Sequence, residues 1–504
     1  MQNAHLMVSS TSRNHFFTVP TSNTMRFEFQ HVASSTMREQ YTTTLTLYGR
    51  MINGKSIAVH VPKIPHYGYF QCDNWVHMKP RIYKYIQLWC SIQHAMKFGL
   101  AQFDHKTGER VACRDKKAAI ERKCNMVKPE LYETSGFNIR DVREGREKCF
   151  IRFQTYSLQT FKHICHVLTK PTREEMTQWL SEENINLEIP AQFQPFMLYE
   201  THIDPDAQYM IDHQLISCGW MSATGQACHV SKTTCSVEMI STRVENIEPP
   251  QDLAPIRVLS YDIEAQPHVY DDGREPGFPE PEVDPILTIG VTWFDLLDTR
   301  PRQAVFQLEP HGVPPLTSLA TLREEQKTDE FDPSTTQVYS FGCEKNMLHS
   351  FALYVRESDP DIITGYNILG FDNPYLIKRA ATLGFESSKF RDTLYVEYNL
   401  GRSLKNTRTS LRKVFRSSNQ TGGSESYQTS LTGRTWTDLF KVVMTDHKLR
   451  SYKMDDVAAE FLGTRKIHIA YADIPEMQKT KEGRHTLATY CVKDSWIPCQ
   501  LGIK

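Results

Sequence analysis

Two apolar, β-prone runs in the second half of the chain most constrain its fold. Residues 256–263 (IRVLSYDI) and 286–294 (ILTIGVTWF) are nearly uninterrupted runs of this kind, and 338–341 is a shorter third. Such runs are typical of strands buried in a central sheet. Between and after them lie helical patterns at 347–356 and 373–383. This alternation predicts an α/β layer built around a central sheet.

The first half of the chain has a different character. Residues 1–40 are rich in Ser, Thr and Asn, a composition that predicts a loose N-terminal arm. Between 41 and 61, alternating apolar residues flank Asn53-Gly54, which predicts two strands joined by a hairpin turn. Further strands are expected near 149–156 and 196–220. Helical patterns are expected at 79–100, 158–168 and 173–180 and, near the C-terminus, at 436–445, 451–461 and 484–501.

Proline and glycine divide the chain into regions. Three prolines in residues 245–255 mark a domain junction, so we expect one domain over 41–250 and a second over 251–504. Within the second domain, 400–434 is rich in Ser, Thr, Asn, Gly and Arg, which predicts an exposed hairpin or loop insertion.

Composition excludes several classes of protein. The 58 Lys+Arg nearly balance the 59 Asp+Glu, which excludes polyelectrolyte binding by the whole chain but permits a local basic groove. The sequence contains no run of 18 or more apolar residues, so no membrane-spanning helix is expected. The first 20 residues lack the pattern of a signal peptide. Twelve scattered cysteines without a Cys-x-x-Cys predict reduced thiols in an intracellular protein.

Two carboxylates stand at the end of the first apolar run. Asp262 and Glu264 are two residues apart, and the period of a strand places both side chains on one face. Burying unpaired carboxylates is costly, and a divalent cation is the usual remedy. Alone, an Asp-x-Glu pair is a weak signal.

Two more acidic positions follow. Asp372 precedes Pro374 at an expected helix start, where a carboxylate is favoured by the helix dipole whether it caps the helix or binds a metal. Tyr490 and Asp494 share a helix face through their i, i+4 spacing; the ordinary alternative is a half-buried tyrosine beside a solvated aspartate. Taken together, four carboxylates and one tyrosine match the requirements of two-metal phosphodiester hydrolysis.

These segments resemble the proofreading exonuclease region of the family-B DNA polymerases. Residues 260–264 (SYDIE), 366–376 (YNILGFDNPYL) and 490–494 (YCVKD) are similar to its three exonuclease motifs. Supporting similarity to the delta-type enzymes lies in 277–286, 359–367, 448–453 and 461–463, and a thinner similarity to their amino-terminal domain lies in 196–220.

The resemblance implies a mixed α+β architecture and a metal site. It implies a ribonuclease-H-like α/β exonuclease domain with a mixed sheet, preceded by a β-rich amino-terminal domain. It also implies that two Mg²⁺ ions, or Mn²⁺ in their place, are ligated by four carboxylates and that Tyr490 positions the attacking water. The four expected ligands are Asp262, Glu264, Asp372 and Asp494.

The resemblance also implies a DNA substrate. The expected reaction is hydrolysis of the terminal phosphodiester of a single-stranded 3′ end at a primer-template during DNA replication, with Asn367 and Phe371 touching the last nucleotides. A stretch without acidic residues supplies candidate phosphate contacts at Arg408, Arg412 and Lys413, beside Arg402, Lys405 and Arg416, although a solvated basic loop is the alternative.

The polymerase motifs of the family's palm do not occur in these 504 residues. We therefore expect palm, fingers and thumb to be absent, and the chain to be the front part of a longer polymerase or one half of a split enzyme. The partners expected are DNA, the missing polymerase domain and a processivity factor, with no membrane. Divergence favours a large-DNA-virus source and hence the host nucleus. The alternatives are a free-standing 3′–5′ exonuclease and an inactivated DNA-binding module.

Overall fold

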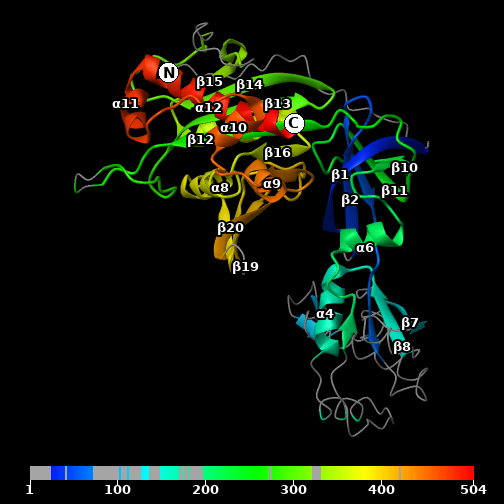
Figure 1. Cartoon of the computed structure of the whole chain (residues 1–504). Coiled ribbons are helices and arrows are strands. Elements are labelled where there is room, and N and C mark those ends of the chain that lie inside the picture. Colours follow the sequence, from blue (N-terminus) through cyan, green and yellow to red (C-terminus); the bar gives the residue numbers. More distant parts are fainter. Residues whose placement is uncertain are drawn as a thin grey trace.

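The computed structural model shows a β-rich amino-terminal region beside a mixed α/β region (Figure 1). It describes residues 24–39, 42–71, 101–103, 110–112, 126–134, 148–169, 174, 177, 181, 197–270, 272, 275–320, 331–418 and 422–504. None of the helices within these ranges is long and apolar enough to cross a membrane.

A closed barrel with strand order β1-β10-β11-β3-β2 forms the first part of the amino-terminal region. Its hairpin β2–β3 turns at Asn53-Gly54, where Gly54 adopts a φ of +80°, and this confirms the predicted hairpin. The prediction of a loose arm is wrong for residues 25–39, because they form β1. The barrel strands are β1 (Met25–Glu39), β2 (Thr42–Arg50), β3 (Ser56–Val61), β10 (Trp220–Ala227) and β11 (Val237–Asn246).

A second sheet, with strand order β7-β8-β4-β9, lies beyond the barrel in Figure 1. The predicted helix at 158–168 is confirmed, with Ser157 as its N-cap, whereas the predicted helix at 79–100 lies outside the described residues. The strands are β4 (His66–Gln71), β7 (Met126–Thr134), β8 (Lys148–Thr155) and β9 (Leu198–Tyr199), with the pair β5 (Ala101–Phe103) and β6 (Arg110–Ala112) and the helices α4 (Leu158–Leu168) and α6 (Pro205–Asp212).

The α/β region is built on a six-stranded sheet of order β15-β14-β13-β12-β16-β21. Strands β12, β13 and β14 pair antiparallel, while the remaining pairs are parallel, so the sheet is mixed. Together with the preceding β-rich region, this confirms the predicted fold class. The strands are β12 (Arg257–Ala265), β13 (Ile286–Asp295), β14 (Asp298–Leu308), β15 (Gln337–Phe341), β16 (Ile362–Gly365) and β21 (Thr435–Asp438).

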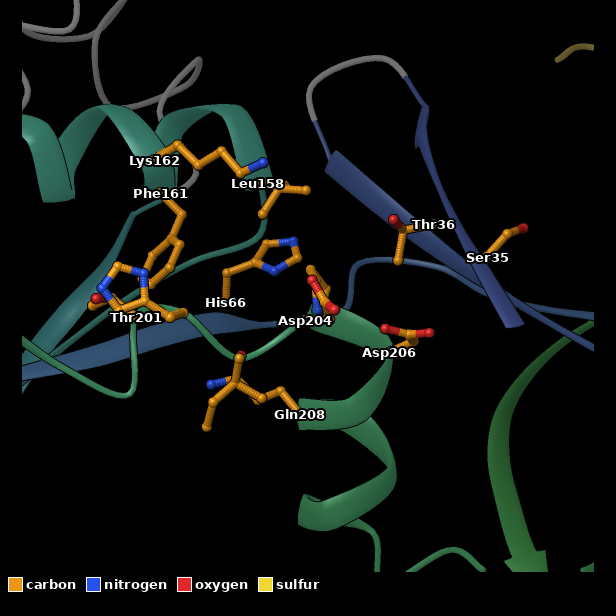
Figure 2. Close-up of a pocket in the computed structure, with 13 residues that line it drawn as sticks. Ser35, Thr36, His66, Leu158, Phe161, Lys162, Thr201, Asp204, Asp206 and Gln208 are labelled. Atoms are coloured by element: carbon orange, nitrogen blue, oxygen red, sulfur yellow. The ribbon is translucent and has the colours of Figure 1, made fainter. Parts of the chain in front are cut away.

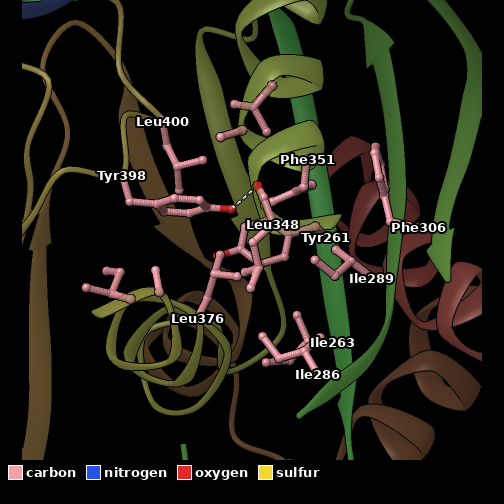
Figure 3. Packing of buried hydrophobic residues seen from close by; sticks show 14 of the residues in the cluster. Tyr261, Ile263, Ile286, Ile289, Phe306, Leu348, Phe351, Leu376, Tyr398 and Leu400 are labelled. Carbon is pink, nitrogen blue, oxygen red and sulfur yellow. Dashed lines mark hydrogen bonds between the residues drawn. The ribbon is translucent and has the colours of Figure 1, made fainter. Parts of the chain in front are cut away.

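Helices cover both faces of this sheet. On one face, α7 and α8 pack against Tyr261 and Ile263 of β12, and the Tyr398 hydroxyl donates to the Leu348 carbonyl at 2.8 Å within the same core (Figure 3). On the other face lie α10 and α12. The helices are α7 (Glu344–Ser358), α8 (Asp372–Thr382), α9 (Leu439–Asp446), α10 (Met454–Leu462), α11 (Ile474–Lys479) and α12 (Lys481–Ile503), with short 3₁₀ turns at Pro333–Thr335 and Tyr471–Asp473.

The segment 400–434 contains the expected hairpin. Its strands β19 (Thr409–Ser418) and β20 (Gly422–Ser430) join β17 (Ser387–Phe390) and β18 (Thr393–Val396) in an antiparallel sheet that projects past α8 in Figure 1. The expected helix at 436–445 begins only at Leu439, because Trp436 belongs to β21.

Candidate active site

Strand β12 carries the first two carboxylates on the sheet face that α12 covers. Asp262 pairs across the ladder with Gly290 of β13, and a Cβ atom at Gly290 would lie 2.4 Å from the carbonyl oxygen of Cys491. Glycine is therefore required for the backbone of α12 to approach this closely. The Cys491 thiol, which accepts the Gly290 N–H at 3.1 Å, lies 3.8 Å from Asp262 Oδ2.

Helix α12 brings the third motif to the strand. Donor oxygens of Asp262, Glu264 and Asp494 all lie within 4.8 Å of one another. Tyr490 lies one turn before Asp494 on α12, and burial together with the neighbouring Asp494 carboxylate raises the pKa of its hydroxyl. Residues 230 positions apart in the sequence thus share one small site.

Asp372 reaches the same strand from the opposite helix layer. It is the first residue of α8, but the N-cap position belongs to Phe371, and no side chain caps this helix. Instead, Asp372 Oδ1 accepts the backbone N–H of Ile263 at 3.1 Å. The carboxylate is therefore anchored to the strand between Asp262 and Glu264, which the capping alternative does not explain.

Burial raises the pKa of every carboxylate in this group, which we call the site carboxylates. Burial and the neighbouring Asp372 and Asp494 hold the pKa of Asp262 well above its usual range. Burial, with Asp494 next, raises the pKa of Glu264 to about 8; burial raises that of Asp372 to about 8 and that of Asp494 to about 6. The site concentrates negative charge that the protein does not fully balance.

Lys466 is a cation that pairs with this site, and no sequence pattern predicted it. Its ammonium forms an ion pair with Asp494 and lies 5.1 Å from the ring centroid of Tyr490. Burial alone would lower the pKa of Lys466, but Asp494 and Asp262 raise it, so the charged form is favoured. Lys466 lies in the loop between α10 and α11, where its backbone N–H donates to Asp455, and no local pattern marks it.

The donor set fits divalent metal ions. Among the described residues, the buried Asp494 Oδ1 has no hydrogen-bond partner. Such an oxygen is costly to bury unless a cation or water reaches it. Carboxylate oxygens are hard donors, which Mg²⁺ and Mn²⁺ prefer.

Asn367 and Phe371 lie beside the site carboxylates rather than among them. Asn367 is exposed with a φ of +60°, and its backbone N–H donates to Asp438 Oδ1 at 2.9 Å. The Leu369 N–H donates to the other oxygen of Asp438 at 3.2 Å, so this buried aspartate, which no sequence motif marks, shapes the loop. Phe371 packs edge-on against Phe278 at 5.3 Å, and Phe278 is 71% exposed.

The basic stretch does not act as one surface. Arg402 is fully buried and pairs with Asp359 and Asp361, so it is no phosphate contact. Arg408 is held by Glu386 and Glu397, which compete with any phosphate for its guanidinium.

Arg412 and Lys413 are both exposed on β19. As neighbours on a strand, they point to opposite faces of the hairpin sheet. One DNA backbone lying flat on the hairpin therefore meets only one of the two.

A cavity of about 530 Å³ lies elsewhere, between the barrel, α4 and α6 (Figure 2). His66, Lys162, Asp204 and Asp206 are among its lining residues, and none of the predicted site residues is. Burial, with Lys162 next, lowers the pKa of His66 to about 4, which keeps its ring neutral.

Comparison with known protein families identifies a match over about half of the chain. Residues 196–457 match the family described as DNA polymerase family B, exonuclease domain. The matched range includes Asp262, Glu264 and Asp372 and ends before Tyr490 and Asp494.

Relatives of known sequence include delta catalytic subunits. The DNA polymerase delta catalytic subunit of Oryza sativa subsp. japonica is 29% identical over 374 residues, covering 72% of this chain and 30% of the relative. That of Bos taurus is 32% identical over 321 residues, covering 61% and 26%. The chain thus spans less than a third of the length of these relatives.

A solved structure shares the fold. The family B DNA polymerase from the archaeon Pyrobaculum calidifontis aligns over 94% of this chain and 45% of its own, with a TM-score of 0.56 at 19% identity. The amino-terminal region and the α/β region therefore both have counterparts in that fold.

Proposed function

We propose, from the premise that this chain belongs to DNA polymerase family B and carries that family's exonuclease domain, that it hydrolyses the terminal phosphodiester at the 3′ end of DNA. One observation carries the proposal. Three carboxylates have donor oxygens within 4.8 Å of one another, and Asp372 is anchored to the same strand. Such a group is suited to metal-assisted phosphodiester hydrolysis rather than to holding a fold together.

The site carboxylates would hold two divalent ions, which supply charge neutralisation and a nucleophilic hydroxide when bound. The chain's own residues do the positioning. The Tyr490 hydroxyl, which shares a face of α12 with Asp494, would orient a water molecule. Lys466 remains charged beside Asp494 and adds positive charge where phosphate negative charge must be accommodated.

Phe278 and Phe371 give the site a surface for a single strand. The two rings lie 5.3 Å apart beside the start of α8, Phe278 is exposed and Phe371 half-buried, and an accessible aromatic ring can stack on any base. The exposed Asn367 lies on the same loop, whose shape Asp438 maintains. A mispaired terminus unpairs more readily, so a site for single strands selects it, as proofreading during replication requires.

The test is degradation of a 5′-labelled single-stranded DNA by the purified chain in Mg²⁺. We expect shortening from the 3′ end and release of nucleoside monophosphates. The double variant Asp262→Asn/Glu264→Gln should be slower by roughly 10³-fold or more, since loss of a single preorganised electrostatic group alone costs about 10²–10³. Tyr490→Phe should be slower with an unchanged fold.

Asp298→Asn is the matched control, because Asp298 is a carboxylate that pairs with Arg300 at the surface. It should cleave at the parental rate. If the double variant cleaves as fast as the parent, the site is wrong. If the correctly folded parent binds DNA but cleaves nothing in Mg²⁺ or Mn²⁺, an inactive DNA-binding module is the better description.

The wider role is part of the proposal. Because the relatives are delta catalytic subunits, we place this chain in DNA replication in the nucleus, acting with a polymerase domain on a primer-template. A processivity factor and a viral source remain predictions, and the relatives named above are eukaryotic.

A further inference from the structure

Three metal-ligating side chains of different types meet on the outer wall of the barrel, apart from the site carboxylates. They are His60 on β3, Cys228 directly after β10 and Glu238 on β11, and their donor atoms all lie within 4.8 Å of one another. We propose that this His60–Cys228–Glu238 cluster binds a zinc ion that secures the loop 228–236.

Strand register explains why the three side chains meet. Ala227 pairs with Met239, whose side chain lies in the barrel core, so the next pair, Cys228 and Glu238, faces outward. The Cys228 N–H donates to the Glu238 carbonyl at 3.1 Å. His60 faces outward for the same reason, because its neighbours on β3, Val59 and Val61, point into the core.

Neighbouring groups orient two of the donors. The Thr46 hydroxyl lies 2.9 Å from His60 Nδ1, and both residues are buried. With the Nδ1 proton donated to Thr46, the other ring nitrogen carries the lone pair that a metal needs. The Lys232 N–H lies 2.9 Å and 3.2 Å from the two oxygens of Glu238, which fixes the carboxylate.

The donor types and the spacing select zinc. An ion centred among donors no more than 4.8 Å apart lies at most about 2.8 Å from each, against about 2.0–2.3 Å for zinc bonds, so small side-chain adjustments close the site. Thiolate and imidazole favour Zn²⁺ over Mg²⁺. Cys228 and Glu238 are half-buried, so water can fill the fourth position.

The loop that zinc would secure joins the barrel to the exonuclease region. Thr233 bridges to Ser403, the Thr234 N–H donates to the Arg402 carbonyl at 2.8 Å, and the Leu404 N–H donates to the Lys232 carbonyl at 2.8 Å. A metal between β3, β10 and β11 would hold both ends of this loop. Zinc would therefore strengthen the attachment between the two regions without touching the catalytic group.

The experiment titrates the metal-stripped full chain with Zn²⁺, and in parallel with Co²⁺, with Mg²⁺ in excess to saturate the site carboxylates. We expect one zinc per chain and a thiolate-to-cobalt charge-transfer band. Cys228→Ser should abolish the band and weaken zinc binding by at least about 10-fold. Thr46→Val should weaken it by about 10-fold, because outer partners of a ligand typically matter by that factor. Zinc should also slow hydrogen exchange at the Thr234 and Leu404 amides.

Two controls separate this site from others. Cys343→Ser removes an exposed thiol at the start of α7 and should bind zinc as the parent does. Asp262→Asn/Glu264→Gln should also retain the zinc. Absence of the cobalt band in the parent, or unchanged zinc affinity in Cys228→Ser, overturns the proposal. Since Cys228 is half-buried and serine is smaller, misfolding does not obscure this outcome.

Discussion

Two groups of buried and half-buried carboxylates lie in the same domain, and their charges are balanced to different degrees. Among the described residues, Asp494 of the site carboxylates forms an ion pair with Lys466, and the charge of Lys493 also favours ionised Asp494. Asp359 and Asp361 meet three arginines, in what we call the arginine network: Arg50 from the barrel, Arg402 and Arg434. The Asp361 carboxylate accepts hydrogen bonds from Arg50 Nε and from Arg402 Nη2, each at 2.8 Å.

The pKa values separate the two groups. Burial by itself raises the pKa of Asp359 and Asp361, but the arginines outweigh it and hold both below their usual range. In Asp262 and Glu264, burial and repulsion from the neighbouring carboxylates outweigh the charge of Lys466 and hold the pKa values above their usual range. Balanced charge ties the barrel to the exonuclease region, whereas the unbalanced charge suits the metal ions proposed for the site.

The largest effect should come from breaking the balanced group. Asp361→Asn leaves Arg50 and Arg402 buried without their shared charge, and we expect a loss of about 3–5 kcal/mol in the free energy of unfolding, measured with urea. Asp298→Asn, at an exposed pair, should leave that free energy unchanged. Equal effects of the two variants would contradict the distinction.

The same type of change should have the opposite sign in the other group. Asp262→Asn/Glu264→Gln relieves repulsion among buried carboxylates, so in a chelator we expect a gain of about 1–3 kcal/mol in the free energy of unfolding. The measurement is urea unfolding with and without Mg²⁺. A loss of stability in the chelator would show that these carboxylates are already balanced.

The dependence of stability on pH should have two opposite limbs. Glu264 and Asp372 have raised pKa values of about 8, so in a chelator their contribution is present at acid pH and is lost as pH rises toward 8. Asp359 and Asp361 have lowered pKa values, so their contribution to stability is lost as the pH falls below about 4. Melting temperature in a chelator should therefore decline by a few degrees between pH 5 and 8.

Magnesium should abolish the decline in melting temperature between pH 5 and 8, because it stabilises the ionised carboxylates. The acid limb should be unaffected by magnesium but weakened in Asp361→Asn. A melting temperature that rises between pH 5 and 8 in a chelator would contradict the assignment of the raised pKa values.

The smallest effect concerns Lys466. Lys466→Gln removes the positive charge that pairs with Asp494. We therefore expect Mg²⁺ to bind a few-fold more tightly. In a chelator, where no Mg²⁺ replaces the lost charge, the variant should melt at a lower temperature than the parent. Magnesium titration of the melting temperature measures both. Lys479→Gln, which removes a surface lysine paired with Glu476, is the control. Weaker magnesium binding in Lys466→Gln would instead make this lysine a support for the ions.

Much of the site could be predicted from local patterns. The alternation around Asp262 and Glu264 placed both on one strand face, and the spacing of Tyr490 and Asp494 placed both on one helix face. Both depend only on the periods of a strand and a helix. The sequence also predicts Asp372 at a helix start. Its hydrogen bond from the Ile263 N–H could not be predicted, because the two residues are distant in sequence and no local pattern relates them.

Charge in the sequence was the poorest guide to contacts. Arg402 and Arg408 belong to one basic stretch, yet Arg402 is fully buried between two aspartates and Arg408 is paired at the surface. Lys466 had no signal at all. A long basic side chain finds its partner through the packing of distant segments, so composition reports that a charge exists and not what it balances.

The sequence by itself determined which elements carry the chemistry, because strand, helix start and helix face follow from the order of apolar and polar residues over a few positions. Only the tertiary structure decided that these elements converge. Gly290 admits α12 to the sheet, and this close approach brings Asp494 within 4.8 Å of Asp262 and Glu264. Such convergence depends on packing between residues some 200 positions apart, which no local periodicity encodes.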